Sequence, residues 1–125
     1  MREFPHILAL EGSPSFTKRL KKELEHLQLS CDLRTVKSPQ SFLQAIKTET
    51  PDALIVGSAS ESSDPMSVLV SVRALNASIP VMVVLEKSDL ETGIQCLKSG
   101  ATGVVPKSKH EQLALLLKEA FNVPN

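Results

Sequence analysis

Residues 51–60 read PDALIVGSAS, and this stretch decides the fold. Four apolar residues, 53–56, stand in a row between a Pro-Asp pair and a Gly-Ser pair. A short apolar run bounded by turn residues is typical of a strand that is buried on both faces. The run IPVMVVLE at 79–86 has the same character, so we expect a parallel sheet with helices on both sides.

Apolar runs and amphipathic stretches alternate five times along the chain, as in a series of βα units. The predicted strands are residues 6–10, 31–36, 53–58, 80–85 and 103–106. The sequence therefore predicts an α/β fold, a flavodoxin-like three-layer sandwich with five parallel strands in the order 2-1-3-4-5 and helices on both faces. We expect a single domain over residues 1–125, with a frayed tail at 122–125.

The segments between the strands have the start signals and apolar faces of helices. Prolines at 14, 39 and 65 each follow a Ser or Asp that can act as N-cap, and Ser88 with Glu91 and Ser108 with Glu111 have capping-box spacing. Gly100 is expected to end the fourth helix. The residues expected to face the core are Phe16, Leu20, Leu24 and Leu27 in the first helix, Phe42, Ala45 and Ile46 in the second, Leu90, Ile94 and Leu97 in the fourth, and Leu113, Leu116, Leu117 and Ala120 in the fifth.

The composition excludes several classes of function. Fourteen basic residues balance fourteen acidic ones, so overall charge favours neither nucleic acid nor an anionic membrane as a partner. The two cysteines, Cys31 and Cys96, have no metal-ligand spacing, which predicts free thiols and no metal site. Because the sequence has neither a signal peptide nor a membrane span, we expect a cytoplasmic protein.

Four segments in chain order resemble the receiver domain of response regulators. ILALEGSPSF (7–16) is similar to the first strand and helix start of that family, and PDALIVGSAS to its third strand. IPVMVVLE is similar to the fourth strand, and GATGVVPKS (100–108) to the fifth strand with its following lysine. The resemblance spans essentially the whole chain and implies a two-component signalling domain that is not itself an enzyme.

The resemblance also implies that the phosphoryl chemistry is lost. In functional members the third strand ends in an aspartate that a partner kinase phosphorylates, and Gly57 stands at the matching position. The acidic pair that holds Mg²⁺ falls on Glu11 and Gly12, so one carboxylate remains. Phosphorylation of an aspartate needs a carboxylate nucleophile, and Mg²⁺ needs several oxygen ligands. We therefore expect no cofactor, and a degenerate pocket that Gly57 leaves emptier.

Four further positions of the family's pocket match residues near the fourth and fifth strands. The hydroxyl residue that contacts the phosphoryl group falls on Leu85, the small residue after it on Glu86, and the switch aromatic on Val104. Only the basic residue, Lys107, is retained. We predict a Glu11–Lys107 ion pair in the space that metal and phosphate have vacated, with Glu86 as a second partner for the lysine.

The family's usual interaction surface, carried over by resemblance, is formed by the fourth helix, fifth strand and fifth helix. Cys96 and Leu115 are expected opposite the buried faces of those helices, where a partner or a second copy of the chain would touch. The third helix, PMSVLVSVRAL (65–75), is apolar nearly all round. If Leu69, Val72 and Leu75 face the sheet, Met66 and Val70 form a second apolar side that either packs internally or meets a partner.

The leading hypothesis is a pseudo-receiver domain that acts through phosphorylation-independent contact with a protein partner or its own effector domain. Two alternatives stay open. One is a phosphoacceptor that uses an unconventional residue, for which Ser58 and Ser60 are close in sequence and Asp64 lies further into the loop. The other is a sensor that binds a small molecule in the altered pocket.

Overall fold

Strands and helices alternate throughout the structure, a computed structural model that describes residues 4–57, 64–86 and 90–121. The elements are β1 (His6–Leu10), α1 (Pro14–His26), β2 (Asp32–Val36), α2 (Pro39–Glu49), β3 (Ala53–Val56), α3 (Pro65–Leu75), β4 (Val81–Leu85), α4 (Leu90–Lys98), β5 (Gly103–Pro106) and α5 (His110–Phe121). All neighbouring strands are parallel, in the order β2-β1-β3-β4-β5. The predicted fold class and strand order are confirmed.

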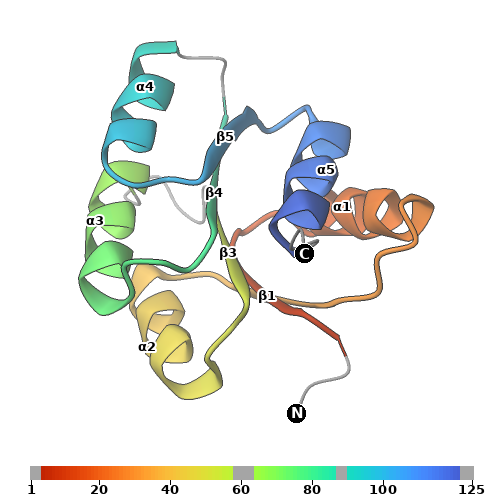
Figure 1. Ribbon diagram of the computed structural model, residues 1–125, viewed down its shortest axis with the longest axis horizontal. Helices are drawn as coiled ribbons and strands as arrows, with labels where there is room; N and C mark the ends of the chain where they lie inside the picture. The colour runs from red at the N-terminus through yellow and green to blue at the C-terminus, as the bar shows by residue number, and fades with distance from the viewer. Residues whose placement is uncertain (1–3, 58–63, 87–89, 122–125) are drawn as a thin grey trace.

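The sheet separates two apolar layers. Figure 1 shows α1 and α5 on one face of the sheet and α2, α3 and α4 on the other. Successive side chains of a strand point to opposite faces, so Ile7 and Ala9 pack beneath α1 and α5, whereas Leu8 and Leu10 pack beneath the other three helices. All four residues of β3 are 0% exposed, as expected for the central strand.

Three helices begin at the predicted caps. The Ser13 hydroxyl accepts a hydrogen bond from the N–H of Phe16 at 3.4 Å, and the Ser38 hydroxyl accepts one from Ser41 at 3.1 Å. The carboxylate of Asp64 caps α3 in the same way. A proline occupies the first turn of each of these helices, where its missing N–H has no intrahelical partner to lose.

The fifth helix does not begin at its predicted cap. The carbonyl of Lys109 accepts the first bond of α5, from Leu113, and the helix begins at His110. The predicted capping box of Ser108 and Glu111 is therefore wrong. The corresponding prediction for Ser88 lies outside the described residues.

The fourth helix is turned relative to its prediction. Leu90, Ile94 and Leu97 were expected to face the core, but they are 79%, 43% and 50% exposed. They stand at positions i, i+4 and i+7, so they form one apolar stripe on the surface. The largest side chains of this short helix therefore mark its solvent face, and the prediction of its buried face is wrong.

Small residues turn the helix because they allow it to approach the sheet closely. Gly93 and Cys96 are the buried residues of α4, and a Cβ built on Gly93 would lie 3.6 Å from the Cγ1 atom of Val104 in β5. A side chain longer than that of alanine at residue 93 would push the helix away from the strand. Cys96 is 0% exposed, so its prediction as a surface candidate is wrong.

The other helices bury mostly the predicted residues. In α3, Leu69 and Val72 are 0% exposed, but Leu75, also expected to face the sheet, is 43% exposed. Met66 is half-buried against the core, whereas Val70 is 58% exposed. Predicted core residues that are fully or partly buried in the remaining helices are Phe16, Leu20, Leu24, Leu27, Phe42, Ala45, Ile46, Leu113, Leu116, Leu117 and Ala120.

Arg73 joins the end of α3 to the end of α4. Its Nε and Nη2 atoms donate to the carbonyl oxygen of Gly100 at 2.9 and 2.6 Å, and Nη1 donates to the carbonyls of Ile79 at 2.8 Å and Asn76 at 3.2 Å. Gly100 has the predicted left-handed conformation, with φ of +109°. A Cβ there would lie 3.0 Å from Arg73 Nε, so glycine is required both by conformation and by the arginine.

We predict that Arg73→Ala lowers the free energy of unfolding by about 1–3 kcal/mol, because three backbone carbonyls lose a charged hydrogen-bond donor. Urea denaturation measures the change. Arg19→Ala, at an exposed arginine of α1, is the matched control and is expected to change stability by less than about 0.5 kcal/mol. Equal effects of the two substitutions would contradict the stabilising role of the Arg73 hydrogen bonds.

Candidate functional site

The predicted pocket residues lie at the carboxyl edge of the sheet. The N–H of Gly57 donates to the carbonyl of Leu10 at 2.9 Å, and the N–H of Lys107 donates to the carbonyl of Leu85 at 2.7 Å. Because these bonds extend the strand ladders by one residue, the ends of β1, β3, β4 and β5 meet here. The structure therefore brings Glu11 and Gly57 together on one side, and Leu85 and Lys107 on the other.

The side chain of Glu11 is the buried charge of this edge. It is 1% exposed, and its Oε1 atom accepts hydrogen bonds from the N–H groups of Gly12 at 3.0 Å and Ser13 at 3.2 Å. The ammonium group of Lys107 lies 3.4 Å from the same oxygen. The predicted Glu11–Lys107 ion pair is confirmed, and two backbone donors from the start of α1 complete it.

Lys107 is held by more than one group. Its Nζ atom lies 3.1 Å from Oε1 of Glu86, as predicted, and 5.8 Å from the ring centre of Phe16. Burial by itself lowers the pKa of the lysine, but the hydrogen bonds and charges of Glu86 and Glu11 outweigh it, so the net pKa is raised. The ammonium form of Lys107 is therefore favoured at neutral pH.

The remaining pocket positions carry no side chain that can attack phosphorus. Gly57 is buried and has no side chain, while Leu85 and Val104 are partly buried and pack against the core beneath α2, α3 and α4. The expected empty space at Gly57 is wrong, because a Cβ at residue 57 would lie only 2.7 Å from Oε2 of Glu11. The glutamate carboxylate fills the position.

These residues do not fit a divalent cation. Of the three positions that the resemblance assigns to oxygen ligands, only Glu11 carries a side-chain oxygen, and its Oε1 atom already faces an ammonium group. Mg²⁺ requires near-octahedral coordination by oxygen. Among the residues that the structure describes, no group of three or more His, Cys, Asp or Glu side chains is arranged to hold a metal ion.

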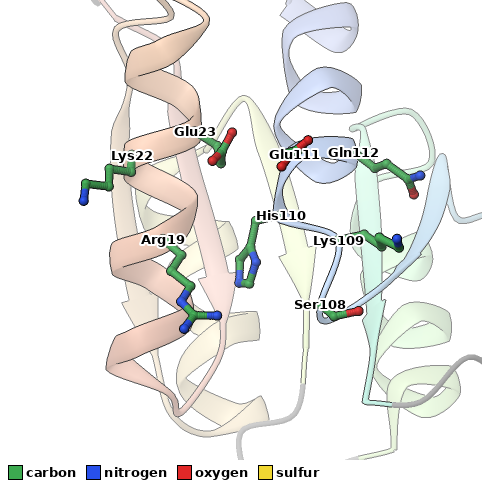
Figure 2. A pocket seen from close by; sticks show the side chains of 8 residues that line it. All are labelled: Arg19, Lys22, Glu23, Ser108, Lys109, His110, Glu111 and Gln112. Carbon is green, nitrogen blue, oxygen red and sulfur yellow. The ribbon is translucent and has the colours of Figure 1, made fainter.

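A cleft of about 310 Å³ between α1 and α5 was not anticipated from the sequence. Figure 2 shows His110 directed from the start of α5 toward α1, beside Arg19 and Glu23. The ring centroids of His110 and Phe16 are 5.0 Å apart. A histidine at the beginning of a helix has no sequence signal for such a contact, because the two helices are far apart in the chain.

The environment of His110 favours its neutral form. Burial and then the positive charge of Arg19 lower its pKa, and these effects outweigh the opposing charge of Glu23. Lys107 also acts to lower the pKa of the ring. Lys107, the partner of Glu11, therefore also influences the histidine in the cleft.

With this geometry described, comparison with known proteins identifies the family. A family model for the response regulator receiver domain matches residues 7–118. The chain belongs to the receiver domain family. Receiver domains are the signalling domains of two-component response regulators and commonly contact partner proteins or effector domains.

Individual relatives of this receiver domain are distant. The chain is 28% identical over 88 residues to the DNA-binding transcriptional regulator NtrC of Klebsiella pneumoniae, a match that covers 70% of this chain but only 18% of that protein. Among solved structures, a response regulator from Hahella chejuensis has a TM-score of 0.83 at 19% identity, with 97% of this chain and 98% of that chain covered. The receiver domain of Francisella response regulator 1452 has a TM-score of 0.78 at 20% identity, with 93% and 95% covered.

None of the helices within the described ranges combines the length and apolar character that crossing a bilayer requires.

We predict that this receiver domain loses stability as the pH falls below 6.5, the ordinary pKa of histidine. His110 has a lowered pKa in the folded state, so the unfolded state binds the proton first and is favoured as the pH falls through the folded pKa. Urea denaturation between pH 5 and 8 measures this effect, as about 1 kcal/mol or less for a partly exposed ring. His110→Gln is expected to remove that part of the pH dependence. An unchanged pH dependence in His110→Gln would contradict the assignment to His110.

Proposed function

We propose that this receiver domain acts by phosphorylation-independent protein contact, as a pseudo-receiver, and catalyses no reaction. The observation that carries the proposal is the pairing of Gly57 with Glu11. The position that needs a carboxylate nucleophile has no side chain, and the neighbouring glutamate occupies the space with its own charge. The degenerate pocket then has a structural role and holds neither metal nor cofactor. Its residues are Glu11, Gly12, Gly57, Leu85, Glu86, Val104 and Lys107.

The two alternative functions have less support. Asp64, the carboxylate considered as a substitute phosphoacceptor, is engaged as the cap of α3, where its Oδ2 atom accepts a hydrogen bond from the hydroxyl of Ser67 at 3.0 Å. Ser58 and Ser60 lie outside the described residues. A small molecule that entered the pocket at Gly57 would meet the carboxylate of Glu11, which fills the space there.

The contact surface that we favour is the apolar stripe of α4, formed by Leu90, Ile94 and Leu97. On α5, which covers the opposite face of the sheet, Leu115 is 51% exposed and is a separate candidate for contact. Contiguous exposed apolar side chains commonly mark protein interfaces. Val70 on α3 is a second candidate, and Met66 contributes less because it is half-buried.

A second copy of the chain is one partner that fits this stripe. Glu91 and Lys98 are both exposed and stand seven residues apart, so they lie on the same side of α4, one near each end. Antiparallel pairing of two α4 helices about Ile94 would bring each glutamate toward the lysine of the other copy. An isologous contact of this kind is the usual form of a homodimer.

The chain also fits a role as one domain of a larger regulator. The matched part of NtrC is 18% of a protein described as a DNA-binding transcriptional regulator. By analogy, residues 1–125 would form a single regulatory domain that contacts its own effector domain in the cytoplasm. Balanced overall charge argues that this domain itself does not bind nucleic acid.

We predict that incubation with acetyl phosphate and Mg²⁺ adds no phosphoryl group to the chain, because Gly57 supplies no nucleophile. Intact-mass spectrometry measures the result, with a receiver domain that retains its aspartate treated in parallel as the positive control. A stoichiometric phosphoryl adduct that is abolished by Asp64→Asn would support the unconventional phosphoacceptor instead.

We predict that the chain forms a homodimer through α4 and that Leu97→Glu weakens dimerisation at least tenfold, since it places a charge in the apolar stripe. Sedimentation equilibrium measures the dissociation constant. Val70→Glu introduces the same charge at an exposed apolar residue of α3 and is the matched control. A monomeric wild type would exclude the homodimer, and greater sensitivity to Val70→Glu would move the interface to α3.

A further inference from the structure

The carboxylate of Glu11 has one satisfied and one unsatisfied oxygen. Oε1 receives two backbone N–H groups and the Lys107 ammonium, all within 3.4 Å. Oε2 is fully buried, and no hydrogen-bond partner for it is found among the described residues. A buried carboxylate oxygen without a donor is unfavourable, so its position requires an explanation.

The explanation lies in the residue beneath it. A Cβ built on Gly57 would stand 2.7 Å from Oε2 and 3.1 Å from the carbonyl oxygen of Leu10. The distance of 2.7 Å to Oε2 is shorter than the contacts that Cβ atoms make in proteins. Oε2 therefore lies directly over the Cα atom of Gly57, in the space that any side chain at this position would need.

The backbone gives no other reason for glycine at residue 57. Gly100 is the glycine with a positive φ in the described part of the chain, and Gly57 lies outside the left-handed region. An alanine at 57 would have no conformational strain of its own. What excludes a side chain there is the neighbouring carboxylate, together with the closely packed carbonyl of Leu10.

We propose that Glu11 and Gly57 form one coupled unit, in which the Glu11 carboxylate is the permanent occupant of the pocket and glycine is required at 57 to admit it. Glu11 then acts as an internal ligand. It binds the start of α1 through Gly12 and Ser13 and binds the loop after β5 through Lys107, so these two loops are joined without any bound phosphate or metal.

The donors hold the carboxylate in this place. If Glu11 rotated toward solvent, the two N–H groups would lose their acceptor, and of its two carboxylate partners Lys107 would keep the exposed Glu86. Each loss is unfavourable, since the donors are part-buried and one of them is charged. A side chain introduced at 57 therefore cannot displace the carboxylate without a loss of stability.

A double-mutant cycle tests the coupling. We expect Gly57→Ala to lower Tm by about 5 °C or more, and we expect most of this loss to disappear when the same substitution is made in a Glu11→Ala background. Thermal unfolding followed by circular dichroism gives the four Tm values. An equal loss in both backgrounds, or no loss in the wild-type background, would overturn the proposal.

Gly93→Ala is the matched control, because it adds the same methyl group to another buried glycine. Among the described residues, a Cβ there would meet Val104, at 3.6 Å, which is ordinary contact. Alanine is favoured over glycine within a helix, so Tm is expected to stay unchanged or rise. A large loss of stability in Gly93→Ala would mean that any added methyl group is harmful here, and the argument from Gly57 would fail with it.

A further variant covers the case in which Gly57→Ala does not fold. Glu11→Asp keeps the charge but withdraws the carboxylate by one methylene, so Glu11→Asp with Gly57→Ala is expected to fold. If neither double variant folds although Glu11→Ala and Glu11→Asp do, the obstacle is not Glu11 and the proposal is wrong.

The coupling of Glu11 with Gly57 rests on the proposed function, because it identifies the group that fills the pocket of a pseudo-receiver. The two can nevertheless fail separately, since the cycle uses no phosphoryl donor. A phosphoryl adduct elsewhere in the chain would exclude the pseudo-receiver function and leave the coupling intact. An equal loss of Tm in both backgrounds would contradict the coupling, but Gly57 would still lack a nucleophile.

Discussion

The carboxyl edge of the sheet depends on one buried charge, the carboxylate of Glu11. Removing a carboxylate from water is unfavourable unless it is paired and hydrogen-bonded. Here the pairing joins two loops that are distant in the sequence, since Glu11 and Lys107 stand 96 positions apart. The geometry of both loops is therefore constrained by the need to keep this charge satisfied.

The sheet is what makes that pairing possible. The apolar strands stack in the order β2-β1-β3-β4-β5, so the ends of β1 and β5 lie on opposite sides of β3 and β4. The side chains of Glu11 and Lys107 bridge this width together, and the Lys107 ammonium also lies near the ring of Phe16. A short residue in place of Lys107 would leave the carboxylate without its counterion.

The same close packing that fills the pocket also shapes the outer surface. Because Gly93 and Cys96 let α4 approach β5 closely, the larger residues Leu90, Ile94 and Leu97 are turned to solvent. A receiver fold without a phosphoacceptor at position 57 thus retains an apolar helix face that suits contact with another protein.

The sequence by itself determined the fold class and most buried faces, because these follow from local periodicity. The strand order and the absence of a nucleophile at Gly57 were predicted from the resemblance to receiver domains. The sequence also predicted the pairing of Glu11 with Lys107, since parallel strand ends share one edge. Only the tertiary structure decided the orientation of α4 and the contact of Glu11 with Gly57. Both depend on how closely two elements that are distant in the chain approach each other. Neither hydrophobic spacing nor motif resemblance predicts that distance.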